Sequence, residues 1–107
     1  MFVEERTYTL QVGKTSDYVR EYIENGLAVQ TKHLGNLIGY FTSEIGTLNQ
    51  VVHLWGYADL ADREERRKAL YGDPHWQSYV PTIRQWVVRQ ENRILVPTTF
   101  SPIGHGH

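Results

Sequence analysis

His53 is the side chain whose type and position are best suited to chemistry. It lies in the middle of a predicted strand, residues 50–58, between apolar neighbours, where a titratable ring needs a hydrogen-bond partner. In one interpretation it faces a pocket as a general base or hydrogen-bonding group, and Trp55 and Tyr57 form walls. In the other it is a buried structural histidine, satisfied by a backbone carbonyl or by a carboxylate such as Glu44. The residue types alone leave both interpretations open.

A second polar group shares one side of a predicted strand. Glu4, Arg6 and Tyr8 alternate along the chain, so their side chains project from the same strand face. Arg6 could hold an anionic ligand, or it could form an ion pair with Glu44 or Glu91 that only orders the interior. The tyrosine hydroxyls could orient a polar substrate, or the rings could simply pack. The candidate ligand-binding residues are therefore Arg6, Tyr8, Tyr40, Glu44, Trp55 and Tyr57.

The residue pattern gives little support to metal or thiol chemistry. The chain contains no cysteine, which excludes disulfides, zinc-thiolate and iron–sulfur sites, and a cysteine nucleophile. His33, His53 and His75 lack the spacing of metal ligands, and no His-Glu-x-x-His motif occurs. His105 and His107 lie in a glycine-containing tail, where they could chelate a metal adventitiously. Neither a cofactor nor a physiological metal is expected.

The composition predicts one small domain. The 107 residues fit a single domain over residues 1–103, followed by a Gly/His tail at 104–107. Eleven Lys and Arg against twelve Asp and Glu give a formal charge of -1, which argues against a nucleic-acid surface. No signal peptide and no apolar run of membrane-spanning length is apparent. A cytoplasmic protein without a membrane partner is expected.

The predicted elements follow one another in the order β-α-β-β-α-β. Strands are predicted over residues 2–10, 37–44, 50–58 and about 90–96. Helical regions are predicted from Thr15 or Ser16 to about His33, and from Asp59 or Asp62 to Gly72 with a restart at Asp73-Pro74. Pro81 predicts a kink or a break in the last helix. This order predicts an α+β, ferredoxin-like fold with an antiparallel sheet and both helices on one face.

The two central strands indicate which side chains share a sheet face. If Thr42 pairs near His53, one face carries small and aliphatic residues that suit helix packing: Leu37, Gly39, Phe41, Val52, Leu54, Gly56 and Ala58. The other face carries an aromatic and polar set, which Tyr8 and Leu10 could join: Ile38, Tyr40, Thr42, Glu44, Val51, His53, Trp55 and Tyr57. In a monomer this aromatic face would be exposed, so a second copy is expected to cover it in a homodimer.

Several segments together resemble one known family. They are Glu5 to Tyr8, Gly39 to Gly46, Asn49 to Tyr57, Asp73-Pro74-x-Trp76, Gln90 to Leu95 and Phe100-Ser101-Pro102. Over about residues 1–103 the chain resembles the NIPSNAP family. The resemblance implies a ferredoxin-like chain that pairs sheet to sheet as a dimeric α+β barrel, related to small cofactor-independent monooxygenases and isomerases. NIPSNAP members have no settled activity, and the resemblance assigns no catalytic residue.

Two functions of different classes follow as hypotheses. In the first, the aromatic and polar interior of a homodimer binds a small organic molecule, with cofactor-independent monooxygenase- or isomerase-like chemistry as an extension. In the second, the chain is a non-catalytic protein-interaction module with a filled interior. Whether the chain is an enzyme is left open. An empty, solvent-connected pocket shared by His53, Arg6 and Glu44 would favour the first hypothesis.

Overall fold

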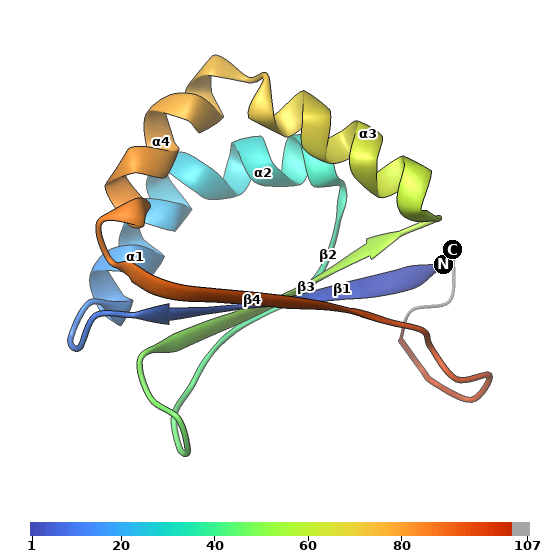
Figure 1. Ribbon diagram of the computed structural model, residues 1–107, viewed down its shortest axis with the longest axis horizontal. Coiled ribbons are helices and arrows are strands. Elements are labelled where there is room, and N and C mark those ends of the chain that lie inside the picture. The colour runs from blue at the N-terminus through green and yellow to red at the C-terminus, as the bar shows by residue number, and fades with distance from the viewer. Residues whose placement is uncertain (104–107) are drawn as a thin grey trace.

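Four antiparallel strands form one sheet, and the helices cover a single face of it (Figure 1). The computed structural model describes residues 1–103. The strands are β1 (Phe2–Leu10), β2 (Asn36–Thr42), β3 (Gln50–Tyr57) and β4 (Val87–Leu95). Their spatial order is β2-β3-β1-β4. The predicted ferredoxin-like fold is therefore confirmed, while the predicted tail at 104–107 lies outside the described residues.

The helical layer has two parts. Between β1 and β2 the chain forms α1 (Thr15–Glu21), a π-helical turn η1 (Tyr22–Gly26) and α2 (Leu27–Leu34). Between β3 and β4 it forms α3 (Leu60–Tyr71) and α4 (Pro74–Arg84). Helices α3 and α4 descend to the sheet from a common high point, so that they form an arch over β4 in Figure 1.

Aspartate side chains begin both helices of this arch. The Asp59 side chain accepts a hydrogen bond from the Asp62 amide at 2.7 Å, and the Asp62 side chain accepts one from the Ala58 amide at 3.0 Å. The sequence left the start of this helix at Asp59 or Asp62, and the structure shows that Asp59 is the N-terminal cap of α3. Asp73 caps α4, as predicted. Helix α4 continues through Pro81, so the predicted break there does not occur.

The helices cover the aromatic face of the sheet, which is the opposite of the prediction. Val51, His53 and Trp55 of β3 lie under the helices and are fully buried. By alternation, Val52 and Leu54 point to the open side. The aromatic residues do share one face of the sheet, but that face is the one buried under the helices. The prediction failed because the helices add tyrosines of their own, which interlock with the sheet aromatics: Tyr18, Tyr22 and Tyr79.

A bulge in β2 changes the predicted pairing. The register shifts between Leu37 and Gly39, so that Leu37 pairs with Trp55 and Tyr40 pairs with His53. Leu37 therefore packs with the buried cluster around Trp55, although the sequence placed it on the opposite face. The predicted pairing of Thr42 with His53 is wrong by two residues, because Thr42 pairs with Val51.

Gly26 allows α4 to pack closely against the π-helical turn. A Cβ atom at this position would lie 2.6 Å from the Tyr79 ring and 2.9 Å from the Tyr22 ring, both of which are buried. Gly26→Ala is therefore expected to lower the free energy of unfolding by about 1–3 kcal/mol, measured by urea denaturation. Gly72→Ala is the control, because its Cβ would meet backbone oxygens only at ordinary contact distance. Equal stability of the two variants would contradict the close packing.

Candidate functional site

One row of side chains crosses all four strands on the helix-covered face. The strand register places Tyr40 of β2, His53 of β3, Arg6 of β1 and Asn92 of β4 next to one another. These four side chains alternate with residues of the open face, so they point toward the helices. The Tyr40 end of the row contacts Tyr18 of α1 and Tyr22 of η1. The Asn92 end lies beside Glu4, which also accepts hydrogen bonds from Arg63 of α3. The row therefore brings polar groups into an aromatic core.

Glu4 is a buried carboxylate held by donors from three elements. It is 0% exposed and accepts hydrogen bonds from Arg6 Nη1 at 3.1 Å and from Asn92 Nδ2 at 2.8 Å. Arg63 of α3 adds two more, from Nε at 3.1 Å and Nη2 at 2.9 Å. Burial opposes ionisation, but the hydrogen bonds of Arg63 and Asn92 and the charge of Arg6 outweigh it and lower the pKa of Glu4 to about 2. Glu4 therefore stays ionised and ties β1, β4 and α3 together.

Arg6 connects this buried carboxylate to the surface. Its Nε donates to the Tyr8 hydroxyl at 3.1 Å, and 12% of its side chain is exposed. Glu44 and Glu91 were the ion-pair partners predicted for Arg6, and the structure shows that Glu4 takes that role. Alternation places Glu4 and Arg6 on one strand face, but it does not predict an ion pair between residues two apart.

The His53 ring has one satisfied nitrogen and one unpaired nitrogen. Trp55 Nε1 donates to His53 Nδ1 at 2.6 Å, which places the hydrogen of a neutral ring on Nε2. Within residues 1–103, Nε2 has no hydrogen-bond partner. Burial and the positive charge of Arg6 lower the pKa of His53 to about 3. Of the two predicted roles, this arrangement favours a hydrogen-bond donor over a general base.

Aromatic rings hold the imidazole in place. Tyr40 stacks on His53 with ring centroids 4.5 Å apart and an angle of 13° between the planes. Tyr8 meets the same ring edge-on at 5.0 Å. The hydroxyls of Tyr40 and Tyr18 are 2.8 Å apart and form a hydrogen bond. Tyr8 and Tyr40, both predicted as site residues, thus surround His53.

Tyr57 is a second buried group without a partner. Its hydroxyl makes no hydrogen bond of acceptable geometry within residues 1–103. Burial and the negative charge of Glu4 raise the pKa of Tyr57, while the nearby Arg67 acts in the opposite direction. The hydroxyl is therefore a neutral donor at pH 7, beside the same charged groups that surround His53.

Glu44 does not join these residues. Strand β2 ends at Thr42, two residues before the predicted end, and Glu44 lies exposed in the connection to β3. The alternation that placed Glu44 beside His53 therefore does not extend that far. The other predicted site residues, Arg6, Tyr8, Tyr40, His53, Trp55 and Tyr57, do lie on one face of the sheet.

Helix α3 contributes arginines from a run of mixed charges, residues 63–68, a pattern that normally indicates a solvated helix face. Arg63 reaches the buried Glu4, and Arg67 follows one turn later on the same side of the helix. Arg67 donates through Nη2 to the Tyr71 hydroxyl, and its guanidinium lies 5.0 Å from the centre of that ring. The four-residue spacing of Arg63 and Arg67 indicates that both side chains lie on one side of the helix. The spacing alone does not show whether that side faces the sheet or the solvent.

An open pocket of about 590 Å³ adjoins this part of α3. It is lined by Glu64, Glu65, Arg67, Lys68 and Tyr71. Tyr71 also lies near Arg6, whose pKa it helps to raise. His53 and Glu4 are themselves fully enclosed. The structure therefore has a closed polar interior with a pocket beside it, in place of the predicted pocket shared by His53, Arg6 and Glu44.

Two negative findings limit the classes of site. Within residues 1–103, no group of three or more His, Asp or Glu side chains is arranged to hold a metal ion. In the same range, no helix has both the length and the apolar composition needed to cross a membrane.

The fold and the site together define a ferredoxin-like α+β protein with a charged interior beneath one helix. Residues 3–102 match the NIPSNAP family model. The chain belongs to the NIPSNAP family. It is 35% identical over 106 residues to Protein NipSnap homolog 3B of Mus musculus, which covers 96% of this chain and 42% of that protein. The human NipSnap homolog 3A is also 35% identical, and the chain covers 40% of it. The chain thus spans less than half the length of these curated relatives.

Two solved structures are similar over most of the chain. A NIPSNAP family protein from Agrobacterium tumefaciens is 50% identical, with a TM-score of 0.94 and coverage of 95% of this chain and 97% of that one. A Nitrosomonas europaea protein named after the antibiotic biosynthesis monooxygenases has a TM-score of 0.66 at 13% identity, with coverage of 91% and 98%. The similarity to the Nitrosomonas europaea protein shows only that the two chains share a fold.

Proposed function

We propose that the chain acts as a homodimeric protein that binds a small organic molecule in the polar interior between α3 and the sheet. Within residues 1–103, three buried polar side-chain atoms have no hydrogen-bond partner: His53 Nε2 and the hydroxyls of Tyr57 and Tyr79. The observation that carries this proposal is that two of them, His53 Nε2 and the Tyr57 hydroxyl, lie on β3 beside the charged groups of the interior. Buried polar groups nearly always have a partner, and leaving one unpaired costs about 1–3 kcal/mol. A bound molecule with acceptor atoms would supply the missing partners.

The charges of the site suit binding and anion stabilisation better than proton abstraction. The pKa values of Glu4, about 2, and His53, about 3, make both groups poor bases at pH 7. Arg6 and the Tyr57 hydroxyl instead carry N–H and O–H groups that can donate hydrogen bonds, as groups that stabilise a developing oxyanion must. Cofactor-independent chemistry on an enolate, as in monooxygenase- or isomerase-like reactions, would use the site in this way. The proposal thus has two parts: binding of a small molecule, and cofactor-independent catalysis on the bound molecule.

A screen against a matched pair of histidine variants tests the binding proposal. Small aromatic and polyketide-like compounds are expected to include members that raise the melting temperature of the wild type. His53→Met keeps a weak acceptor near Trp55 but has no hydrogen-bond donor, so these shifts should shrink. His75→Met, at an exposed histidine of α4, should leave them unchanged. A screen without any stabilising compound, or equal shifts in all three proteins, would overturn the proposal.

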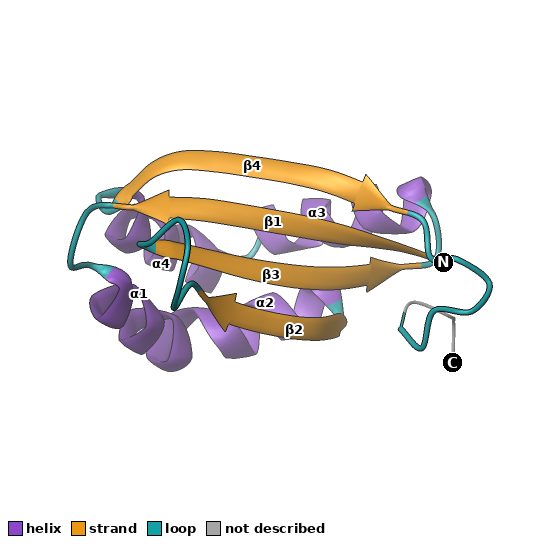
Figure 2. Ribbon diagram, turned by 90° about the horizontal axis from the view of Figure 1, so that it is seen from below, coloured by secondary structure: helices purple, strands orange, loops and turns teal. Residues whose placement is uncertain are grey.

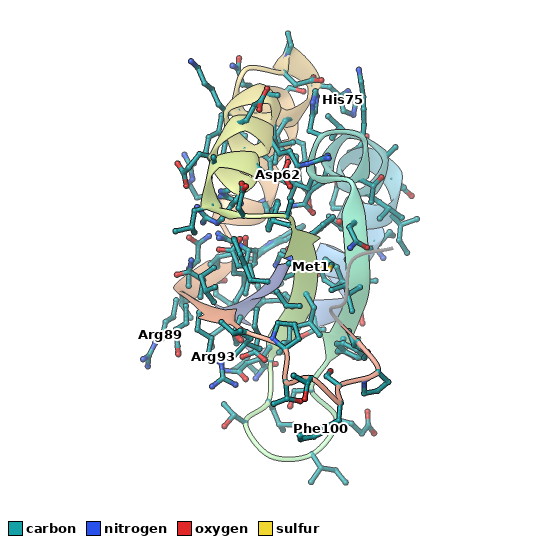
Figure 3. All side chains as sticks on the ribbon, turned by 90° about the vertical axis from the view of Figure 1, so that its right-hand side faces the viewer. Met1, Asp62, His75, Arg89, Arg93 and Phe100 are labelled. Carbon is teal, nitrogen blue, oxygen red and sulfur yellow. The ribbon has the colours of Figure 1, made fainter. Side chains whose placement is uncertain are left out.

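The open face of the sheet is the surface proposed for the second copy. Figure 2 shows this face uncovered along all four strands. Val52 and Leu54 point outward, and the Phe41 ring, 55% exposed, lies against Gly39 beside them. The β4 side of the face carries charges, among them Arg89 and Arg93, which Figure 3 shows projecting away from the helices. A two-fold related copy would match the apolar part of the face with itself.

Light scattering after size-exclusion chromatography is expected to give twice the chain mass of 12.5 kDa. Leu54→Lys should shift the protein to the single-chain mass, because it places a charge in the apolar part of the face. Ile23→Lys changes an equally apolar, exposed residue of η1 and should leave the dimer intact. A wild-type monomer, or a dimer that tolerates Leu54→Lys, would overturn the proposed interface.

A non-catalytic interaction module is the alternative function. The observation in its favour is a set of exposed apolar side chains at the ends of the sheet: Ile45, Leu48, Val96 and Phe100. Phe100 lies beyond the sheet, on the side away from the helices (Figure 3). If this alternative holds, the interior donors are paired with water, and no compound of the screen raises the melting temperature.

A further inference from the structure

The pocket along α3 contains a guanidinium without an acidic partner. Within residues 1–103, Arg67 forms no ion pair, whereas Arg63 pairs with both Glu4 and Glu64. Glu64, although it lines the pocket, is thus already engaged at 2.6 Å. The present partner of Arg67 is the Tyr71 hydroxyl, a neutral group. A carboxylate would be a stronger partner, because a guanidinium matches it with two parallel hydrogen bonds.

Arg67 also lies next to the unpaired donors of the interior. Its charge lowers the pKa of His53 and opposes the rise in the pKa of Tyr57. One arginine therefore adjoins both the open pocket and the buried hydroxyl and imidazole. The pocket lining holds two acidic and two basic side chains: Glu64, Glu65, Arg67 and Lys68. An anionic ligand therefore has to place its charge directly on Arg67.

The pocket wall also offers an aromatic surface. The Tyr71 ring is 53% exposed, and it already lies beneath the Arg67 guanidinium. A flat organic group can pack on such a ring while its charged end meets the guanidinium. Lys68 adds a second positive charge to the pocket lining.

We propose that this pocket binds a small organic acid, with the anionic end on Arg67 and the organic part on Tyr71. The inference rests on the proposed binding function and names its ligand class. The ligand displaces the Tyr71 hydroxyl from Arg67. The Tyr57 and His53 donors are enclosed and do not line the pocket, so acceptor atoms of the ligand reach them only when the side chains that cover them move. Tight binding thus requires a negative charge on the ligand. On the protein it requires the planar guanidinium of Arg67, since a positive charge of another shape does not suffice.

Calorimetric titrations with benzoate, benzamide and inorganic phosphate test the ligand class. Benzoate is expected to bind at least tenfold more tightly than benzamide, which has the same ring without the charge. Phosphate should bind more weakly than benzoate, because it lacks the organic part. Failure to detect benzoate at about 10 mM, ten times the Kd of a weak millimolar ligand, would overturn the inference. So would equal binding of benzoate and benzamide, or tighter binding of phosphate.

Arginine variants test the position of the ligand. Arg67→Met should weaken benzoate binding at least tenfold, and Arg67→Lys should recover only part of that loss. Arg84→Met removes the same charge from the last turn of α4 and should change the affinity less than twofold. Melting temperatures of the variants establish that they are folded. Unchanged benzoate affinity in Arg67→Met would overturn the inference.

The outcomes separate this inference from the proposed function. If benzoate binding is insensitive to Arg67 while other compounds still stabilise the protein through His53, only the ligand class is wrong. If no compound binds wild-type protein, the proposed function fails as well.

Discussion

Glu4→Gln is expected to lower the free energy of unfolding by about 3–5 kcal/mol at pH 7. The substitution preserves the shape of the side chain but removes the one negative charge in the interior cluster. Arg6 and Arg63 are then left partly buried without their shared carboxylate. The carboxylate accepts four hydrogen bonds, from Arg6, Arg63 and Asn92. The amide nitrogen of glutamine cannot accept a hydrogen bond, so some of these donors lose their acceptor.

Urea denaturation followed by tryptophan fluorescence measures this loss. Glu5→Gln is the matched control, because Glu5 is the neighbouring residue and pairs with Arg93 across the open face at 2.9 Å. An exposed pair of this kind contributes about 0–1 kcal/mol. If both substitutions cost the same, the Glu4 cluster does not hold α3 to the sheet.

Acidification from pH 7 to pH 4.5 is expected to remove about 2–3 kcal/mol of stability through His53 alone. Its pKa is about 3 in the folded chain and 6.5 as the ordinary value. Below pH 6.5 the His53 ring therefore binds a proton in the unfolded chain but stays neutral in the folded chain. The free energy of unfolding consequently falls as the pH falls. Each pH unit in this window costs up to about 1.4 kcal/mol.

Glu4 extends the same trend to lower pH. Its pKa is about 2 in the folded chain, against an ordinary value of 4.5. Its contribution is thus fully present above pH 4.5 and is lost as the pH falls toward 2. The size of this contribution is about 3 kcal/mol.

A histidine variant separates the two contributions. His53→Gln has no ring to titrate, so between pH 7 and 4.5 it should lose about 2 kcal/mol less stability than the wild type. NMR titration of the wild type gives a second measurement, in which the His53 ring should not titrate between pH 8 and 5. A slope in His53→Gln equal to that of the wild type would contradict the buried neutral ring.

The order of the elements was predictable because it depends on local signals. Asp73-Pro74 begins α4 through a side-chain cap and a preset backbone angle, both of which can be read from neighbouring residues. The choice of buried face was not predictable in this way. Alternation sorts His53 and Val52 onto opposite faces, but it does not say which face meets the helices. That choice depends on the tyrosines of distant helices, such as Tyr22 and Tyr79.

The site was predicted in part for the same reason. Glu4, Arg6 and Tyr8 share a strand face by alternation, and the structure joins them by direct hydrogen bonds. Arg67 and its neighbours were read as a solvated helix face, because mixed charges along a helix normally are solvated. Only the path of α3 over the sheet, fixed in part by Arg63 on Glu4, turns these arginines inward.

The central claim is that a ligand pairs the buried His53 Nε2 donor. Nitrogen NMR of the imidazole tests it most directly, with any compound that raises the melting temperature in the screen. A neutral ring with its hydrogen on Nε2 is predicted at pH 7, and that resonance should shift as the compound is added. The claim is contradicted if the compound binds and stabilises the protein while the His53 Nε2 resonance stays unchanged.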